Sequence, residues 1–251
     1  MHLQKPSEIT HHNLQMQLYR YCKQNKLTNV RRGLYVVNST QTFHSNIINP
    51  LLVAGKATDD SVLAYHSALE SHNIAYTDFN EHTYLTSVQT SDFDFQNQHY
   101  RAILNKNLNA HNLSQCIEPI NIMGIKIYRT SLERTIVDVL DKPEISGGWE
   151  EVFRSLERIT IFKPELTIEY AISLNKANII AKLGYFLEER PGYLKIDAKI
   201  IKRLLSYIPK QPYYLDRKSI RKGKYIKKWQ IVIPNYLLNR EWEEPNNDID
   251  Y

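Results

Sequence analysis

The alternation of apolar and polar residues is most regular between residues 130 and 158. Thr130 and Glu133 have the spacing of a capping box, which predicts the start of a helix. The apolar residues behind them recur at helical spacing: Leu132, Ile136, Val139 and Leu140. After Pro143 and a Gly–Gly turn, a second set recurs at i, i+3, i+4 and i+7: Trp149, Val152, Phe153 and Leu156. The stretch therefore predicts two amphipathic helices joined by a turn.

Residues 13–25 have a similar periodicity, with a cationic, amide-rich side opposite an apolar one formed by Leu14, Leu18, Tyr21 and Cys22. Asn25 is expected to cap this helix, and the basic turn Arg31–Arg32–Gly33 leads into a β-rich segment at 34–37. A helix followed by a basic strand is typical of the recognition helix and wing of a winged helix-turn-helix, although a solvated amphipathic helix explains the local pattern equally well. The predicted DNA contacts are Gln17, Arg20, Lys23, Gln24, Lys26, Arg31 and Arg32.

The middle of the chain mixes helical and strand signals. Residues 40–49 are polar and predict a linker, with a boundary near residue 45. A short helix is expected from Pro50, and a second one has its apolar side in Val62, Leu63, His66 and Leu69. Patches rich in β-formers lie at 84–86, 100–104, 115–117 and 125–128, with Met123 and Gly124 as a hairpin turn.

Helical periodicity returns at 166–187 and 197–207, and the chain then becomes strongly basic. Residues 217–228, RKSIRKGKYIKK, hold seven basic residues and no acid, and a strand ending at Pro234 follows. A solvated hairpin or loop accounts for many such runs. The functional interpretation is a surface that contacts phosphates through Arg217, Lys218, Arg221, Lys222, Lys224, Lys227 and Lys228.

Composition and the absence of known motifs limit the kinds of function that fit this sequence. The 251 residues carry a net charge of +5 with a pI near 9.0, which is compatible with a nucleic-acid partner. Two distant cysteines, the lack of a signal-peptide pattern and the lack of a long apolar run predict a cytoplasmic protein without a membrane partner. The nine histidines have no zinc-site spacing, and the sequence has no phosphate loop or nucleophile elbow. We therefore expect no metal, no cofactor and no catalytic residue, and hence no enzyme.

Several segments together carry a family resemblance: residues 18–35 ending in RRGLY, 67–70, 131–141 with 147–151, 183–188 and 229–242. In their order and spacing the chain resembles the AbiEi antitoxins of bacterial type IV (abortive infection) toxin–antitoxin systems and their transcriptional-regulator relatives. The resemblance covers nearly the whole chain, and its motifs are structural rather than catalytic.

The resemblance implies a function. In such proteins an N-terminal winged helix binds operator DNA and represses the operon, while a C-terminal domain counters a nucleotidyltransferase toxin of the AbiEii type. It implies that Arg20, Lys23, Gln24, Arg31 and Arg32 lie on the DNA-facing helix and wing. The implied partners are operator DNA of the chain's own promoter and a cognate AbiEii-like toxin, countered directly or indirectly. Homodimerisation is a separate hypothesis, since it would supply the DNA-contact area that the short N-terminus lacks.

The expected fold class is α+β, in three parts. Residues 1–45 would form a reduced winged helix-turn-helix, because only 12 residues precede Asn13 and leave room for about one helical turn. Residues 46–190 would form the AbiEi-like mixed α/β antitoxin core, whose C-terminal portion is helical. Residues 191–251 would be a basic extension with a short helix and strands.

Two other functions stay open from the sequence. The first is an antitoxin-like interaction or adaptor protein that does not bind an operator, which the short N-terminus would allow. The second is a metal-dependent nuclease that uses acids such as Asp138, Asp141 or Glu165, which predicts cleavage of nucleic acid with a divalent metal.

Overall fold

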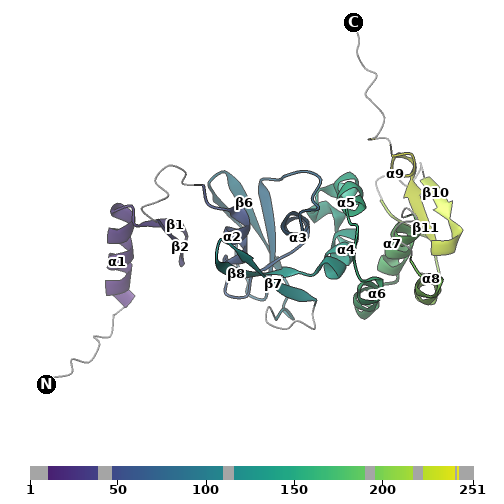
Figure 1. Ribbon diagram of the computed structural model, residues 1–251, viewed down its shortest axis with the longest axis horizontal. Coiled ribbons are helices and arrows are strands. Elements are labelled where there is room, and N and C mark those ends of the chain that lie inside the picture. Colours follow the sequence, from purple (N-terminus) through teal and green to yellow (C-terminus); the bar gives the residue numbers. More distant parts are fainter. Residues whose placement is uncertain are drawn as a thin grey trace, which may run out of the picture.

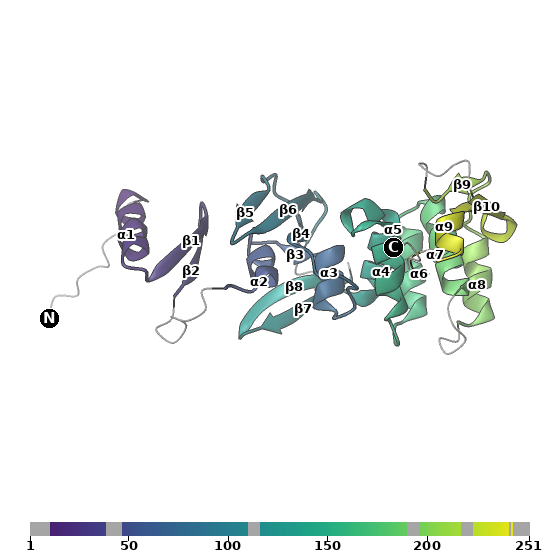
Figure 2. The same ribbon diagram turned by 90° about the horizontal axis from the view of Figure 1, so that it is seen from above.

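The computed structural model describes residues 11–38, 47–109, 116–189, 196–216, 223–240 and 242. These residues form a mixed α+β fold, as predicted. The molecule is elongated: a helix and a hairpin lie at one end, a six-stranded sheet lies in the middle, and helices with a small second sheet form the other end (Figure 1, Figure 2).

The N-terminal end consists of α1 (His11–Lys23), β1 (Leu27–Arg31) and β2 (Leu34–Val37). Asn25 adopts φ 53°, in the left-handed region. The N–H of Asn25 donates to the carbonyl of Cys22 at 3.0 Å, and the N–H of Lys26 donates to the carbonyl of Tyr21 at 2.9 Å. The predicted cap is therefore confirmed, as a Schellman motif. The predicted burial of one helix side is wrong, because Leu14 is 46% exposed and Tyr21 44% exposed. The periodicity is real, but among the described residues the hairpin covers only a strip of α1.

The central sheet has the order β5–β6–β4–β3–β8–β7. Its strands are β3 (Val62–Leu63), β4 (Glu81–Thr86), β5 (Phe93–Phe95), β6 (Gln98–Leu104), β7 (Ile117–Ile122) and β8 (Ile125–Thr130). The β3–β8 and β4–β6 pairs are parallel and the other pairs antiparallel. Met123 and Gly124 both have positive φ, 51° and 82°, so the predicted hairpin turn between β7 and β8 is confirmed.

Two short helices, α2 (Pro50–Gly55) and α3 (His66–Ser71), pack on the sheet. The helix predicted around Val62 and Leu63 is wrong at these two residues, which form the strand β3. Val62 and Leu63 belong to different hydrophobic clusters, one on each face of the sheet, because successive strand residues point to opposite sides. A strand buried on both faces is an apolar run that period alone does not distinguish from a helix.

The other end is mainly helical. It contains α4 (Leu132–Asp141), η2 (Pro143–Ile145), α5 (Gly148–Glu157), α6 (Pro164–Ser173), α7 (Ala177–Glu188), α8 (Ala198–Leu205) and α9 (Asn235–Leu238). A small sheet of order β10 (Gly223–Ile226), β11 (Ile231–Pro234) and β9 (Tyr213–Tyr214) lies beside them, with η4 (Lys227–Trp229) between β10 and β11. The fully buried Trp229 joins both parts in one hydrophobic cluster.

The two helices predicted at residues 130–158 are confirmed as α4 and α5, with one change at the cap. Ser131, not Thr130, is the N-cap, and its hydroxyl accepts from the N–H of Arg134 at 3.4 Å. The hydroxyl of Thr130 instead lies 2.7 Å from that of Thr135. Gly147 and Gly148 both have positive φ, 88° and 89°, which explains the Gly–Gly turn before α5.

Candidate nucleic-acid interface

The predicted DNA-contacting residues lie on α1, at its C-terminal turn and on the hairpin. Six of the seven side chains are exposed: Gln17, Arg20, Lys23, Gln24, Lys26 and Arg32. Arg32 lies at the β1–β2 turn next to Gly33, whose φ of 87° suits glycine. Lys23 and Lys26 lie over the rings of Tyr19 and Tyr21, at 5.6 and 5.7 Å from the ring centres. The helix end and the hairpin turn thus present cationic side chains to solvent.

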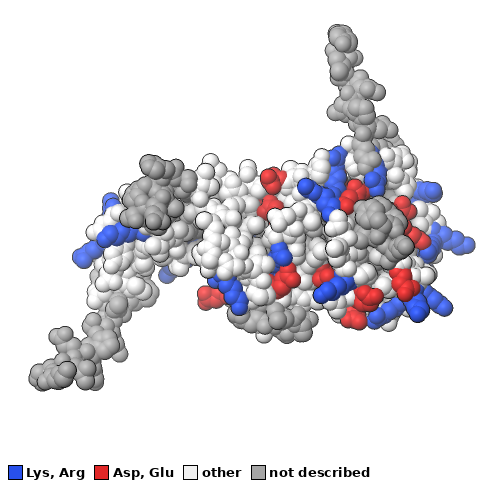
Figure 3. All heavy atoms as spheres, in the orientation of Figure 1, with Lys and Arg blue, Asp and Glu red and all other residues white. Residues whose placement is uncertain are grey.

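Within residues 11–38, the described part of this end, no acid offsets the basic residues. Residues 11–38 contain five basic residues and no acid, while the whole chain carries +5, so the rest of the sequence is formally neutral. In the space-filling view, Lys and Arg atoms at this end have no acidic atoms beside them, whereas both signs intermingle over the helical end (Figure 3). An exposed cationic surface without paired acids attracts phosphates more strongly than a surface of ion pairs.

Arg31 has a different environment from the other six residues. Its guanidinium donates from Nη2 to the hydroxyl of Thr90 at 2.7 Å and lies 4.9 Å from the ring centre of Phe93. Burial raises the pKa of the neighbouring Tyr84, and the positive charge of Arg31 opposes that shift. Arg31 therefore attaches the hairpin to the central sheet, and it does not lie with the exposed cations.

The basic segment at 217–228 is described only in part. Arg217, Lys218, Arg221 and Lys222 lie outside the described residues. Lys224 and Lys227 are exposed, whereas Lys228 pairs with Glu188 and lies 5.6 Å from the ring centre of Trp229. Lys224 and Lys227 therefore fit the predicted phosphate-contacting surface better than Lys228.

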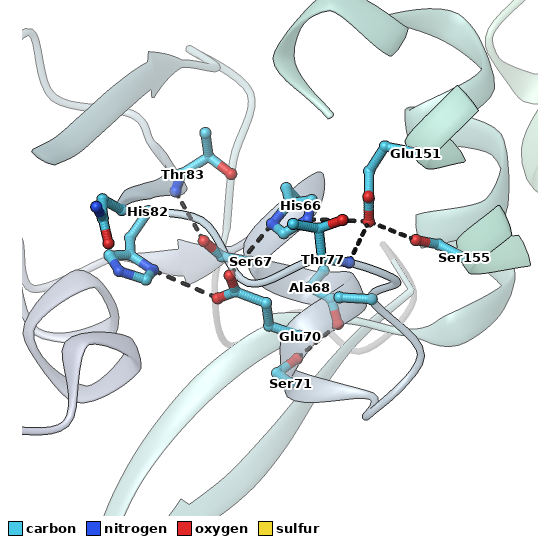
Figure 4. A network of polar contacts seen from close by, with 12 residues as sticks. His66, Ser67, Ala68, Glu70, Ser71, Thr77, His82, Thr83, Glu151 and Ser155 are labelled. Carbon is cyan, nitrogen blue, oxygen red and sulfur yellow. Dashed lines mark hydrogen bonds and ion pairs between the residues drawn. The ribbon is translucent and has the colours of Figure 1, made fainter. Parts of the chain in front are cut away.

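A buried polar cluster that the sequence did not predict lies between the central sheet and the helical end (Figure 4). His66 on α3 lies between two carboxylates, with Nδ1 3.2 Å from Glu70 and Nε2 3.3 Å from Glu151 on α5. The other oxygen of Glu70 lies 3.3 Å from Nδ1 of His82 on β4. Glu151 also accepts from the N–H of Tyr76 at 2.9 Å. The i, i+4 spacing of His66 and Glu70 was the one local signal for this cluster.

The cluster holds the His66 imidazolium between the carboxylates of Glu70 and Glu151. Burial lowers the pKa of His66, but its hydrogen bonds with Glu151 and Glu70 outweigh burial and raise that pKa to about 9. Burial raises the pKa of Glu151, but hydrogen bonds from His66, Ser155 and Thr77 outweigh burial and lower it to about 2. His66 and Glu151 are 2% and 5% exposed, so the ion pair is closed to substrates and ties α3 to α5.

The acids considered for a nuclease are held by other contacts or lie apart. Asp138 is buried, accepts from Arg134 at 3.0 Å and from Tyr170 at 2.8 Å, while Asp141 pairs with Lys176 at 2.7 Å. Glu165 is exposed in the first turn of α6. In the part of the chain that the structure describes, no three His, Cys, Asp or Glu residues come together in a way that could hold a metal ion.

Every helix in the described part of the chain is too short or too polar to cross a bilayer. No protein-family model matches the chain, and no curated protein matches it. Among solved structures, the crystal structure of the RV2827C protein from Mycobacterium tuberculosis is similar in fold, with a TM-score of 0.63 and 12% sequence identity. The match covers 92% of this chain and 83% of that one. At this identity the likeness concerns the fold alone.

Proposed function

We propose that this chain is an AbiEi-type antitoxin and DNA-binding autorepressor of a type IV toxin–antitoxin system, countering a nucleotidyltransferase toxin. Its N-terminal end acts as a reduced winged helix: α1 takes the place of the recognition helix and the β1–β2 hairpin that of the wing. The observation that carries this proposal is the acid-free cationic surface of residues 11–38.

The arrangement of the cations supports duplex DNA as the partner. Arg20 and Lys23 lie in the last turn of α1, and Arg32 lies at the hairpin turn, so a helix and a β-turn offer basic groups from one module. Gln17 and Gln24 add amides that suit base edges in the major groove, whereas the cations suit phosphates. Arg31 acts indirectly, because it fixes the hairpin on the sheet.

A gel shift with the DNA upstream of the chain's own gene tests the DNA-binding half. Wild-type protein is expected to shift this fragment at low salt, and the variant Arg20→Ala/Lys23→Ala/Arg32→Ala is expected to lose the shift while it stays folded. A matched control is Lys199→Ala/Lys202→Ala/Arg203→Ala, which removes the same charge from α8. Equal loss in both variants would contradict a specific role for residues 11–38.

Co-expression tests the antitoxin half. A nucleotidyltransferase encoded beside this gene should arrest growth alone and cease to do so with the wild-type chain. Because the helical end does not depend on the α1 cations for its core, the Arg20→Ala/Lys23→Ala/Arg32→Ala variant should still rescue growth. Growth arrest that the wild-type chain leaves unchanged would refute this half.

One observation favours a second candidate, an adaptor that binds protein rather than an operator. Within the described residues α1 is the single helix before α2, and it exposes Leu14, Met16 and Tyr19. An exposed apolar strip on a helix suits contact with another protein. Retention of toxin rescue without any shift of upstream DNA would support this candidate.

A further inference from the structure

The small sheet at the helical end has one buried and one exposed face. Its register places Ile226 of β10 opposite Ile231 of β11, and Ile231 opposite Tyr213 of β9. This row belongs to the main hydrophobic cluster. Side chains of adjacent residues on a strand point to opposite faces, so the next row faces outward.

The outward row is aromatic. Tyr225 of β10 lies opposite Val232 of β11, and Val232 lies opposite Tyr214 of β9. Tyr225 is 44% exposed and Tyr214 is 38% exposed, and Val232 between them is half-buried. Neighbouring strands are about 4.8 Å apart, so the two tyrosines stand roughly 10 Å apart on one face.

One of the rings is held in place by the hairpin that carries lysines. The hydroxyl of Tyr225 lies 2.7 Å from Oε1 of Gln230, and the amide of Gln230 donates to the carbonyl of Lys227 at 3.1 Å. Gln230 adopts φ 52°, in the left-handed region. The ring of Tyr225 is thereby fixed beside the loop from which Lys227 projects.

The segment that carries β10 and β11 is basic. Residues 217–240 contain eight basic residues and no acid. Among the described residues, the exposed Lys227 follows Tyr225 by two positions, whereas the exposed Lys224 pairs with Ile233 and so belongs to the row of the opposite face. Aromatic rings beside an exposed lysine suit a ligand that carries both flat rings and negative charge, which describes the bases and phosphates of nucleic acid.

We propose that the outward face of the β9–β10–β11 sheet binds single-stranded nucleic acid, with Tyr214 and Tyr225 stacking on bases and Lys227 contacting phosphates. Duplex bases are already stacked on one another, so a duplex would contact Lys227 but not the two rings. The β9–β10–β11 face is separate from α1 and the β1–β2 hairpin, at the opposite end of the molecule (Figure 1). The proposal does not rest on the DNA-binding residues of α1 and the hairpin. It concerns part of the basic segment 217–228, in which the sequence predicts phosphate contacts.

Fluorescence anisotropy with a labelled oligothymidylate of about 15 nucleotides tests the proposal on the full chain. Wild type is expected to bind this strand more tightly than the matching duplex at low salt. Tyr214→Leu/Tyr225→Leu keeps apolar side chains but removes both rings, and is expected to weaken binding about tenfold or more. Tyr214→Phe/Tyr225→Phe keeps the rings and should bind within about twofold of wild type.

The chain offers a matched control in Tyr207, which is 47% exposed just beyond α8. Tyr207→Leu should leave binding unchanged. Thermal unfolding confirms that each variant is folded, and if the double Leu variant is not, single Tyr214→Leu carries the test with a loss of about threefold or more.

Three results would overturn the proposal: no binding of wild type to the strand, equal binding of strand and duplex, or unchanged binding when both rings are removed. The Arg20→Ala/Lys23→Ala/Arg32→Ala variant should bind the strand like wild type. If this variant no longer binds the upstream duplex but still binds the strand, the duplex site on residues 11–38 and the single-strand site on the β9–β10–β11 face act independently, and each proposal can fail without the other.

Discussion

The N-terminal module and the contact between α3 and α5 are both built around charge, but they use it in opposite ways. In residues 11–38 five basic residues have no acid in the same segment, and six of the seven predicted contact residues are exposed. Between α3 and α5, His66 and Glu151 are buried and paired, with Glu70 on the other side of the imidazole.

The two regions show two roles of charge, one in the stability of the fold and the other in binding a partner. A buried charge costs several kcal/mol in lost hydration unless a partner compensates it, so the His66–Glu151 pair matters for stability. An exposed cation costs little to leave unpaired and remains available to an anionic partner. Charge in the α1–hairpin module should therefore affect binding, and charge between α3 and α5 should affect folding.

The largest expected effect is on stability, from Glu151→Ala. This change leaves the His66 imidazolium buried without one partner and removes one of the two acceptors for the N–H of Tyr76, the other being the hydroxyl of Ser155. We expect a loss of about 3–5 kcal/mol in the free energy of unfolding, measured by urea denaturation. The neighbouring Glu150→Ala is the control: Glu150 is exposed and pairs with Arg154 at 3.1 Å, so its loss should cost less than about 1 kcal/mol. Equal losses would remove the distinction between the two carboxylates.

The same cluster predicts how stability depends on pH. The pKa of His66 is raised from 6.5 to about 9, so its contribution is complete below pH 6.5 and is lost as the pH rises through 9. The pKa of Glu151 is lowered from 4.5 to about 2, so its contribution is complete above pH 4.5 and is lost as the pH falls through 2.

The cluster should therefore stabilise the fold most between pH 4.5 and 6.5. Between pH 6.5 and 9 wild type should lose on the order of 3 kcal/mol that a His66→Leu variant does not lose. Urea denaturation at a series of pH values measures the difference. Parallel pH curves for the two proteins would show that His66 is not the titrating group.

A smaller effect should distinguish two adjacent arginines. Arg31→Ala removes the hydrogen bond to Thr90 and the interaction with the ring of Phe93, so we expect stability to fall by about 1–2 kcal/mol. Arg32→Ala lies at the exposed hairpin turn and should change stability by less than about 0.5 kcal/mol. It should instead reduce the salt dependence of DNA binding by the equivalent of about one phosphate. The opposite assignment, with Arg32 stabilising and Arg31 neutral, would contradict the placement of the hairpin.

The sequence predicted best where local signals were strong. Caps, a proline, a Gly–Gly turn and helical spacing gave α4 and α5, and the Met123–Gly124 pair gave the β7–β8 turn. The helix prediction was wrong at Val62 and Leu63, because a two-residue strand that is buried on both faces shows no alternation of apolar and polar residues.

In the candidate sites too, local spacing predicted some features, whereas contacts between distant residues determine the others. The exposed cations of α1 follow from helical spacing, whereas the inward position of Arg31 depends on Thr90 and Phe93, 59 or more residues away. The spacing of Glu151 predicts an acid on the surface of the first helical turn, but His66, 85 residues earlier, lies against it. Contacts of this kind follow from how the sheet and the helices pack and cannot be seen from the spacing of residues along the chain.

The most direct test of the central claim is the salt dependence of binding to the upstream DNA, measured by anisotropy for wild type and for Arg20→Ala/Lys23→Ala/Arg32→Ala. Each phosphate that the protein no longer neutralises should reduce the slope of log affinity against log salt by about 0.9. We predict that the triple variant reduces the slope by about two to three at unchanged stability. An unchanged slope would contradict the claim that residues 11–38 form the DNA-binding surface.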